Sequence, residues 1–182
     1  MLKIIFFVLA SIGIILFSLK SFRVRYSHGF FRFFAFEGIL ALTLMNIETW
    51  FSDPFSFRQV ISWILLIVSL YFVTVSILLI HRIGKPSPDV NEPQNVGFEN
   101  TTTLVTVGAY KYIRHPMYAS LLFLVWGVYF KDPVGVGLVI AAAVAAFLYA
   151  TARVEERENT KRFGDEYVAY MKKTKMFIPY IF

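Results

Sequence analysis

The chain has 182 residues, a net charge of +6 and no cysteine; 57% of its residues are hydrophobic and only 16% are charged. This composition, with a mean hydropathy of +0.61, excludes an ordinary soluble domain of this length and indicates an integral membrane protein. The lack of cysteine excludes disulfides, thiolate metal ligands and a cysteine nucleophile. We therefore predict one all-α membrane domain that covers residues 1–182.

Five apolar segments follow one another along the chain, and each is predicted to cross the bilayer as a helix. The predicted spans are Ile4–Leu19, Phe33–Trp50, Val60–Ile80, Met117–Phe130 and Val134–Ala152. They divide the chain into an N-terminal three-helix part, residues 1–83, and a second part, residues 84–182. The second part begins with a long polar connection, and a polar loop of this length is usually functional or disordered.

The basic residues are distributed unevenly between the two ends of these spans. With five spans, fifteen of the eighteen basic residues fall on one side of the membrane, and only Lys3, Arg58 and Lys131 fall on the other. Cytoplasmic segments of membrane proteins carry an excess of Lys and Arg. The sequence therefore predicts a multi-pass protein with an external N-terminus, whose long connection and C-terminal tail lie together on the cytoplasmic side.

A polar motif lies where the long connection turns back into an apolar span, and it runs from Gly108 to Tyr118. Pro116 suits the first position of a helix, where no backbone donor is needed. A helix start there, with Arg114 and His115 beside it, would offer unpaired N–H groups and positive charge to an anionic group. The alternative is a membrane-interface cap in which Arg114 meets lipid phosphates within an aromatic belt.

A second charged cluster follows the fifth span directly. If that helix continues, Arg153 shares a face with Glu156 and Arg157, while Glu155 points elsewhere. A carboxylate at this level of the membrane could pair with the basic helix start or hold polar groups of a ligand. The alternative is a solvated tail, since charge runs usually mark solvated faces.

A short amphipathic helix is predicted after this cluster. Gly164 is expected to end the preceding helix, and Asp165 is expected to cap the next one. The apolar face of this last helix would carry Tyr167, Tyr170 and Met171. A helix of this kind is typical of segments that lie on the membrane surface.

Four sequence blocks in this part of the chain occur in a recognisable order. They are Thr103–Thr106 with Gly108 and Tyr110, then Arg114–Pro116 with Tyr118, then Glu155 and Glu156, and finally Phe163–Tyr167 with Tyr170. Together they resemble the isoprenylcysteine carboxyl methyltransferase family, part of a wider group of membrane methyltransferases that includes phospholipid N-methyltransferases. The resemblance extends from Gly84 to Pro179, whereas the first three spans match only in being hydrophobic.

The resemblance implies S-adenosylmethionine as the cofactor, held in a cytosolic pocket that the C-terminal half forms. The family's cofactor contacts carry over to Thr102, Thr103, Leu104, Val105, Tyr110, His115, Pro116, Met117, Tyr118 and Glu155. An amide side chain upstream also contacts the cofactor in this family, and Gln94 or Asn95 could fill that place. A family arginine that contacts substrate aligns with Thr151, so Arg153, two residues on, is the candidate for its role.

Methyl transfer from a sulfonium is an in-line displacement that needs alignment and a dry site more than an acid–base pair. A carboxylate acceptor is already ionised, whereas an amine acceptor needs a base, for which Glu37 and His115 are the candidates. For Glu37, an acidic residue within a span, the alternative is a salt bridge to Arg32, Arg114 or Arg153. His28 and His81 are expected to lie at the membrane interface.

The expected partners are a lipophilic or prenylated substrate and membrane lipid, with no nucleic acid and no metal. Isoprenylcysteine carboxylate, a phospholipid amine and another small amphiphile all stay open as acceptors. Two alternatives come from other functional classes. Sterol reductases carry a similar Arg-His-Pro-x-Tyr segment and use a reduced nicotinamide, and a non-catalytic membrane subunit or lipid-binding protein would also account for the composition.

Overall fold

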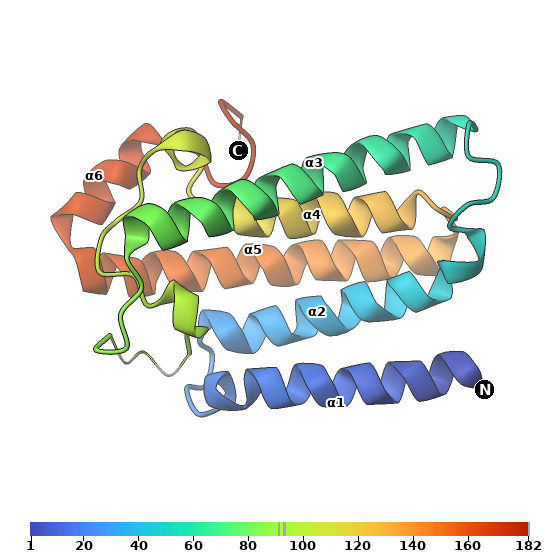
Figure 1. The fold of residues 1–182 in the computed structure, drawn as a ribbon, viewed down its shortest axis with the longest axis horizontal. Helices are drawn as coiled ribbons and strands as arrows, with labels where there is room; N and C mark the ends of the chain where they lie inside the picture. The colour runs from blue at the N-terminus through green and yellow to red at the C-terminus, as the bar shows by residue number, and fades with distance from the viewer. Residues whose placement is uncertain (91, 93, 182) are drawn as a thin grey trace.

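The computed structural model describes residues 1–90, 92 and 94–181. Throughout these ranges the protein is helical and has no β-strand, which confirms the all-α prediction (Figure 1). The six α-helices are α1 (Leu2–Phe22), α2 (His28–Met45), α3 (Phe57–Leu79), α4 (Pro116–Tyr129), α5 (Gly135–Phe163) and α6 (Asp165–Lys173). Shorter helical turns are η1 (Ile47–Thr49), the π-helical η2 (Ile80–Gly84), η3 (Gly97–Glu99) and η4 (Gly108–Lys111).

Each of the five predicted apolar segments forms a helix, and the protein is a multi-pass membrane protein. Four helices in the described ranges are long and apolar enough to cross a membrane: Leu2–Phe22, His28–Met45, Phe57–Gly84 and Gly135–Phe163. The remaining apolar helix, α4, has 14 residues. Since a residue adds about 1.5 Å to a helix, α4 is shorter than the bilayer core, and it packs lengthwise against α3.

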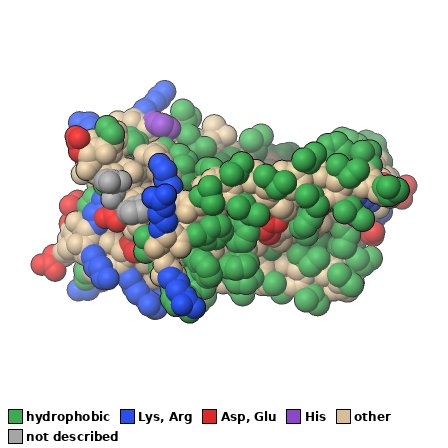
Figure 2. Space-filling model, turned by 90° about the horizontal axis from the view of Figure 1, so that it is seen from below, with side chains coloured by type: hydrophobic (Ala, Val, Ile, Leu, Met, Phe, Trp, Pro, Cys, Tyr) green, Lys and Arg blue, Asp and Glu red, His purple; other side chains and the backbone are tan. Residues whose placement is uncertain are grey.

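The helices run alternately up and down, so the two chain ends lie at opposite ends of the bundle (Figure 1). The N-terminus occupies one end, and the long connection, α6 and the C-terminal segment occupy the other. Helix α2 packs mainly on α5, and α1 lies outside against α2. Apolar side chains cover most of the length of the bundle in Figure 2, while Lys and Arg side chains gather at the end that carries the connection.

The close approach of α2 and α5 depends on a glycine. A Cβ atom added at Gly38 would lie 2.4 Å from Cγ2 of Val144, so no larger residue fits without a shift of the helices. Ala141 and Val144 on the facing side of α5 are almost fully buried. Small residues at such an interface allow helices to pack closely in lipid.

The end of the bundle at which the N-terminus lies is held together by a buried lysine. Lys131, in the turn between α4 and α5, is 0% exposed and donates a hydrogen bond of 2.9 Å to the side-chain oxygen of Gln59 in α3. Its ammonium group lies 3.3 Å from the ring centroid of Trp63 and 5.2 Å from that of Trp50. Such cation–π contacts stabilise a desolvated ammonium group, and here they join the α4–α5 turn to α3.

Candidate active site

The predicted helix start is confirmed, since α4 begins at Pro116 with His115 as its N-cap residue. The backbone just before it is paired with the C-terminal segment. The N–H of Arg114 donates to the carbonyl of Lys175 at 2.8 Å, and the N–H of His115 donates to the carbonyl of Met176 at 3.2 Å. These two donors are therefore not free for an anion, which corrects that part of the anion-site hypothesis.

The Arg114 side chain is also engaged. Its Nε lies 2.7 Å from Oε1 of Glu156, and its Nη1 donates to the carbonyls of Met171, at 3.3 Å, and Thr174. Both charged side chains are largely buried. Arg114 thus joins the start of α4, helix α5 and the C-terminal segment, and its role in this structure is to hold these elements together rather than to meet lipid phosphates.

His115 lies between two carboxylates and has a ring nitrogen without a hydrogen bond. The residue is 4% exposed; its Nδ1 lies 3.7 Å from Oε2 of Glu155, and its Nε2 lies 3.6 Å from Oε1 of Glu156. Both distances exceed a hydrogen bond, and Nε2 is buried without any hydrogen-bond partner. Nε2 is itself inaccessible and faces Glu156, whereas Nδ1 faces Glu155, which lines the cavity described next.

A cavity opens beside this histidine at the end of the bundle that carries the connection. Water-sized spheres have about 90 Å³ of room in it, and the wider space that includes the open mouth is about 650 Å³. Seven of the ten predicted cofactor contacts line it: Leu104, Val105, Tyr110, His115, Met117, Tyr118 and Glu155. The structure leaves Thr102, Thr103 and Pro116 out of its wall, because the two threonines are exposed and Pro116 is packed in the first turn of α4.

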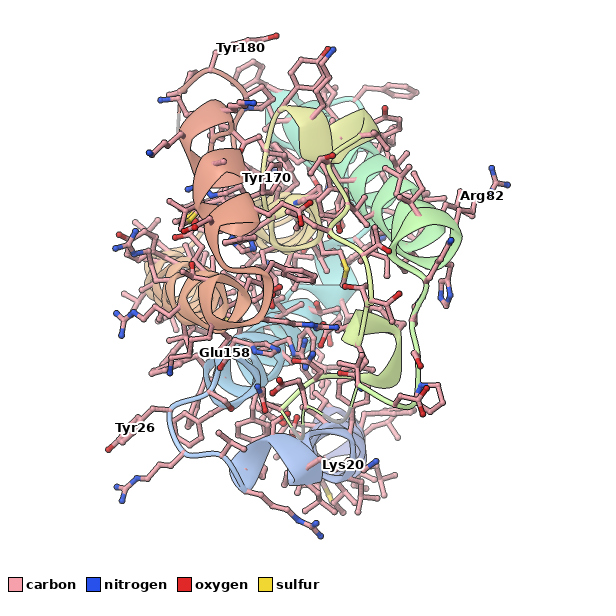
Figure 3. All side chains as sticks on the ribbon, turned by 90° about the vertical axis from the view of Figure 1, so that its left-hand side faces the viewer. Lys20, Tyr26, Arg82, Glu158, Tyr170 and Tyr180 are labelled. Carbon is pink, nitrogen blue, oxygen red and sulfur yellow. The ribbon has the colours of Figure 1, made fainter. Side chains whose placement is uncertain are left out.

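Helix α6 lines the cavity with its tyrosines, so the face that was expected to contact the membrane packs against the protein. Tyr167 and Tyr170 line the cavity and are almost fully buried. Figure 3, viewed onto this end, shows Tyr170 on the side of α6 that faces the bundle, whereas Arg82 points away from it. Gly164 ends α5 as predicted, but it also takes the N-cap position of α6, so Asp165 is the first helical residue.

The tyrosines of the cavity are held in their neutral form. Burial, together with the negative charge of Glu155, raises the pKa values of Tyr110 and Tyr167 above the ordinary value for tyrosine, and burial raises that of Tyr170. The Tyr170 hydroxyl donates a hydrogen bond of 2.6 Å to the carbonyl of Tyr110. The cavity therefore offers aromatic faces and phenolic O–H groups rather than phenolate charge.

A second, more polar cavity adjoins the first and shares three of its lining residues, Glu99, Glu155 and Asn159. Both amide residues considered as cofactor contacts, Gln94 and Asn95, line this second cavity. An aromatic compartment and a polar one therefore meet at Glu155 and Glu99. This combination suits a ligand that has both an aromatic group and charged groups.

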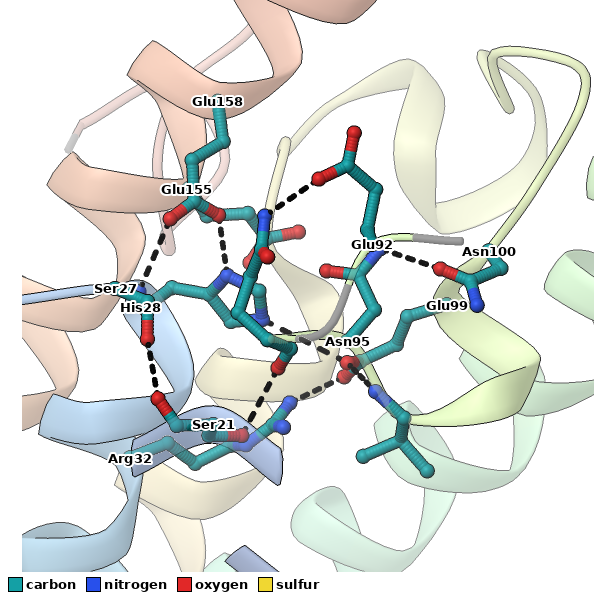
Figure 4. A network of polar contacts seen from close by, with 12 residues as sticks. Ser21, Ser27, His28, Arg32, Glu92, Asn95, Glu99, Asn100, Glu155 and Glu158 are labelled. Carbon is teal, nitrogen blue, oxygen red and sulfur yellow. Dashed lines mark hydrogen bonds and ion pairs between the residues drawn. The ribbon is translucent and has the colours of Figure 1, made fainter. Parts of the chain in front are cut away.

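Glu99 is the centre of a network that sequence reasoning missed, and Figure 4 shows it in close view. Arg32 donates from Nη1 to Oε1 of Glu99, and His28 places Nε2 3.6 Å from Oε2 of Glu99. On its other side, His28 places Nδ1 2.5 Å from Oε2 of Glu158 in α5. His28, the first residue of α2, is 2% exposed, so its side chain is buried within the protein.

The free energy of unfolding is expected to depend on Glu99 within a defined pH window. Burial alone would raise the pKa of Glu99, but Arg32 and His28 lower it from 4.5 to about 2. The ionised carboxylate therefore stabilises the fold fully above about pH 4.5, and this contribution is lost as the pH falls toward about 2. Unfolding of the wild type and Glu99→Gln in detergent should show a stability gap that closes over this window; a gap independent of pH would contradict the assignment.

Two candidate catalytic residues lie outside both cavities. Glu37 in α2 accepts a hydrogen bond of 2.7 Å from Ser11 in α1, and its other oxygen is buried without a partner. The salt-bridge alternative for Glu37 is wrong, because the three arginines considered for it pair with other carboxylates: Arg32 with Glu99, and Arg114 and Arg153 with Glu156.

Arg153 lies on the outer side of α5, where half of its side chain is exposed. It approaches Oε2 of Glu156 to 3.5 Å, as the helical spacing predicts. It lines two shallow grooves that share Tyr149, not the cavity beside His115. Thr151, the position aligned with the family's arginine, is buried and donates to the carbonyl of Phe147, so the structure brings neither residue into the cavity.

The fold defines a helical membrane protein with a cavity at one end of the bundle, built from the segments before α4, at the end of α5 and in α6. The chain belongs to the phospholipid methyltransferase family, whose sequence profile matches residues 57–166. The matched region includes Leu104 to Glu155, and thus most of the cavity wall. No solved structure matches the chain.

Curated relatives match shorter parts of the chain. A protein named methanethiol S-methyltransferase 1, from Bradyrhizobium diazoefficiens, is 33% identical over 73 residues, which are 39% of this chain and 24% of that protein. A protein-S-isoprenylcysteine O-methyltransferase from Mus musculus is 34% identical over 84 residues, 45% of this chain and 29% of that protein. The methanethiol S-methyltransferase of Pseudomonas deceptionensis is 32% identical over 71 residues, 38% and 26% of the two chains. The aligned parts thus span less than a third of these relatives.

Proposed function

We propose that the protein is a membrane methyltransferase that uses S-adenosylmethionine to methylate a lipophilic acceptor. The observation that carries the proposal is the convergence of His115 and Tyr118, at the start of α4, with the distant Glu155 of α5 on one cavity within the region that matches the family. His115 places Nδ1 3.7 Å from Oε2 of Glu155, so the two residues that line this wall lie next to each other. The names of the relatives support methyl transfer as the reaction.

The residues of the two cavities suit this cofactor. The aromatic and apolar side chains of Leu104, Val105 and Tyr118 would cover its less polar parts, and Glu155 and His115 would meet its polar groups. When bound, S-adenosylmethionine supplies a methyl group activated by a sulfonium charge. The task of the chain is to align the two reactants and exclude water, and α6 contributes by covering the cavity with Tyr167 and Tyr170.

The test of this function is calorimetric titration of the detergent-purified protein with S-adenosylhomocysteine, with a reduced nicotinamide in parallel. Binding of S-adenosylhomocysteine alone is the expected result. Binding of the nicotinamide alone would favour the reductase alternative, and binding of neither by a folded preparation would favour a non-catalytic role.

The acceptor is proposed to be lipophilic, most like the prenylated cysteine that the mouse relative's name indicates, with a phospholipid or small amphiphile as the alternative. Arg153 and Arg157 line a groove with Tyr26, Phe31 and Tyr149 on the outside of α5. A groove with apolar walls and two guanidinium groups suits an amphiphile with an anionic group. Arg153 is therefore proposed to bind the acceptor rather than the cofactor.

Replacing Arg153 with alanine is accordingly expected to lower kcat/KM for the acceptor by about tenfold or more, the loss of one charge-assisted contact. The affinity for S-adenosylhomocysteine should stay unchanged, because Arg153 lies outside the cavity. The measurement is methyl transfer in nanodiscs to prenylated cysteine, phospholipid and thiol acceptors. If kcat/KM for the acceptor and the affinity for S-adenosylhomocysteine fall equally, Arg153 acts on the cofactor rather than on the acceptor.

The cytoplasmic placement of the connection and of α6 is also a proposal, supported by the gathering of Lys and Arg at that end (Figure 2). Because the chain has no cysteine, single cysteines report the side of the membrane directly. Ser52→Cys, in the exposed turn before α3, is expected to react with an impermeant maleimide in intact cells. Lys172→Cys, exposed on α6, should react only after the membrane is opened. If Lys172→Cys reacts in intact cells and Ser52→Cys does not, the protein has the opposite orientation in the membrane.

A further inference from the structure

The cavity wall is completed by residues outside the region that matches the family. That region begins at residue 57, so α1 and α2 lie before it. His28 and Arg32, in the first two turns of α2, nevertheless contact Glu99 at the wall shared by the two cavities. The N-terminal helices therefore have a structural link to the proposed cofactor site, and the inference below rests on the proposed function.

Glu99 belongs to a segment of the long connection, residues 94–101, which we call the strap. Its carboxylate is fully engaged on the side away from the cavity: Oε1 accepts from Arg32, and Oε2 accepts from the N–H of Val96 at 2.8 Å and lies 3.6 Å from Nε2 of His28. Arg32 and His28 of α2 therefore compensate the charge of Glu99, and through these contacts Glu99 attaches the strap to α2.

Further contacts hold the strap at its two ends. Ser21 at the end of α1 donates a hydrogen bond of 3.0 Å to the carbonyl of Gln94. Arg162 in α5 donates to the carbonyls of Thr101 and, at 3.4 Å, Glu99. The strap is thus attached to α1, α2 and α5 by hydrogen bonds and ion pairs between groups that lie far apart in sequence.

The strap lies between the cavities and the N-terminal helices. Glu99 and Thr101 of the strap line the first cavity, and Gln94, Asn95 and Glu99 line the second. The opposite wall belongs to α5, α6 and the start of α4. A movement of the strap away from α2 would widen the shared wall, and it would break the contact between Arg32 and Glu99.

We propose that His28 and Arg32 form a latch that holds the strap against the cavity and sets the rates at which the cofactor binds and leaves. Both are positioning residues that act through Glu99. His28 links the strap to Glu158 of α5 at the same time, so the latch joins both walls of the polar cavity. Removing a buried partner leaves the other charge uncompensated, which favours the released strap.

A latch and a simple binding contact differ in their kinetics. Loss of a contact made with the ligand raises only the dissociation rate, and the dissociation constant rises in proportion. Loss of a latch that blocks the path raises the association and dissociation rates together, because both passages cross the same barrier. The ratio of the two rates, and so the affinity, then changes much less than either rate.

The experiment measures binding and release of labelled S-adenosylhomocysteine by the full chain in nanodiscs. Arg32→Met, which keeps the length of the side chain, is expected to raise both rates by about tenfold or more, the effect of one charge-assisted contact. Arg32→Lys keeps the charge and should restore most of the wild-type rates. Arg25→Met is the matched control, because Arg25 lies in the loop just before α2, is exposed and stacks on Tyr26.

A second measurement does not depend on a destabilised variant. Ser21→Cys combined with Gln94→Cys, in this cysteine-free chain, can be bridged by a short thiol-reactive cross-linker. The bridge should slow both binding and release, and cleavage of a reducible linker should restore them. Unchanged rates in the bridged protein and in Arg32→Met would overturn the latch, as would a rise in the dissociation rate alone. If the wild type binds no S-adenosylhomocysteine, the proposed function fails, and the latch fails with it.

Discussion

Replacing Glu155 with glutamine is expected to lower the affinity for S-adenosylhomocysteine by about 10- to 150-fold, the effect of losing about 1.5–3 kcal/mol of charge-assisted hydrogen bonding. Glu155 lines both cavities. Within the described residues it has no arginine or lysine partner; its contacts are His115 at 3.7 Å, Asn159 at 3.5 Å and the hydroxyl group of Tyr118. Its carboxylate is therefore available to a ligand, unlike that of Glu99 or Glu156.

His115→Ala is expected to lower the affinity at least as much, because it removes the unpaired ring nitrogen and the stacking surface that faces Tyr118. Glu166→Gln provides the control, since Glu166 is an exposed carboxylate of α6 outside both cavities. The measurement is calorimetric titration of variants that are inserted in the membrane. If Glu155→Gln and His115→Ala both bind S-adenosylhomocysteine with wild-type affinity, the cofactor does not bind in this cavity.

Replacing Glu156 with alanine is expected to destabilise the protein by about 3–5 kcal/mol, the usual cost of removing one partner of a buried ion pair. Arg114 would keep only the carbonyls of Met171 and Thr174 as partners. The double variant Arg114→Met, Glu156→Leu should recover much of this loss, because it replaces both charges with apolar groups of similar size. Equilibrium unfolding in mixed micelles measures both.

Arg153→Met is the matched control for this prediction. Arg153 also pairs with Glu156, but half of its side chain is exposed, so the pair should contribute less than about 1 kcal/mol. The same carboxylate is thus tested against a buried and an exposed arginine. If Glu156→Ala and Arg153→Met lower the free energy of unfolding equally, the buried contact of Glu156 with Arg114 stabilises the protein no more than the exposed contact with Arg153.

The parts of the fold that the sequence predicts are those that depend on local properties. Hydropathy finds every apolar helix, and Pro116 marks the start of α4 because of its own covalent structure. The start of α2 is predicted five residues too late, at Phe33 instead of His28. The prediction starts after Arg32 because a charged residue interrupts an apolar segment of sequence. In the structure Arg32 is nevertheless buried within the helix bundle, because it pairs with Glu99.

The parts of the site that the sequence does not predict depend on distant partners. Glu99 meets Arg32 across 67 positions, and His28 meets Glu158 across 130, and no local pattern indicates either pair. The tyrosine face of α6 is amphipathic in either environment, so periodicity cannot distinguish burial against the protein from contact with lipid. The cofactor contacts that rest on the family resemblance stay predictions, although seven of the ten meet at one cavity.

The pairing of the C-terminal segment with the start of α4 has a consequence for biosynthesis. Lys175 exchanges backbone hydrogen bonds with Tyr112 and Arg114, and Met176 accepts one from His115. A ribosome adds residues in order, at about 5–20 per second, so α1 to α5 enter the membrane before this segment exists. A nascent chain that stops short of residue 174 is then an inserted bundle in which the N–H groups of Arg114 and His115 still lack their carbonyl partners, so the start of α4 is completed only when Lys175 and Met176 have been added.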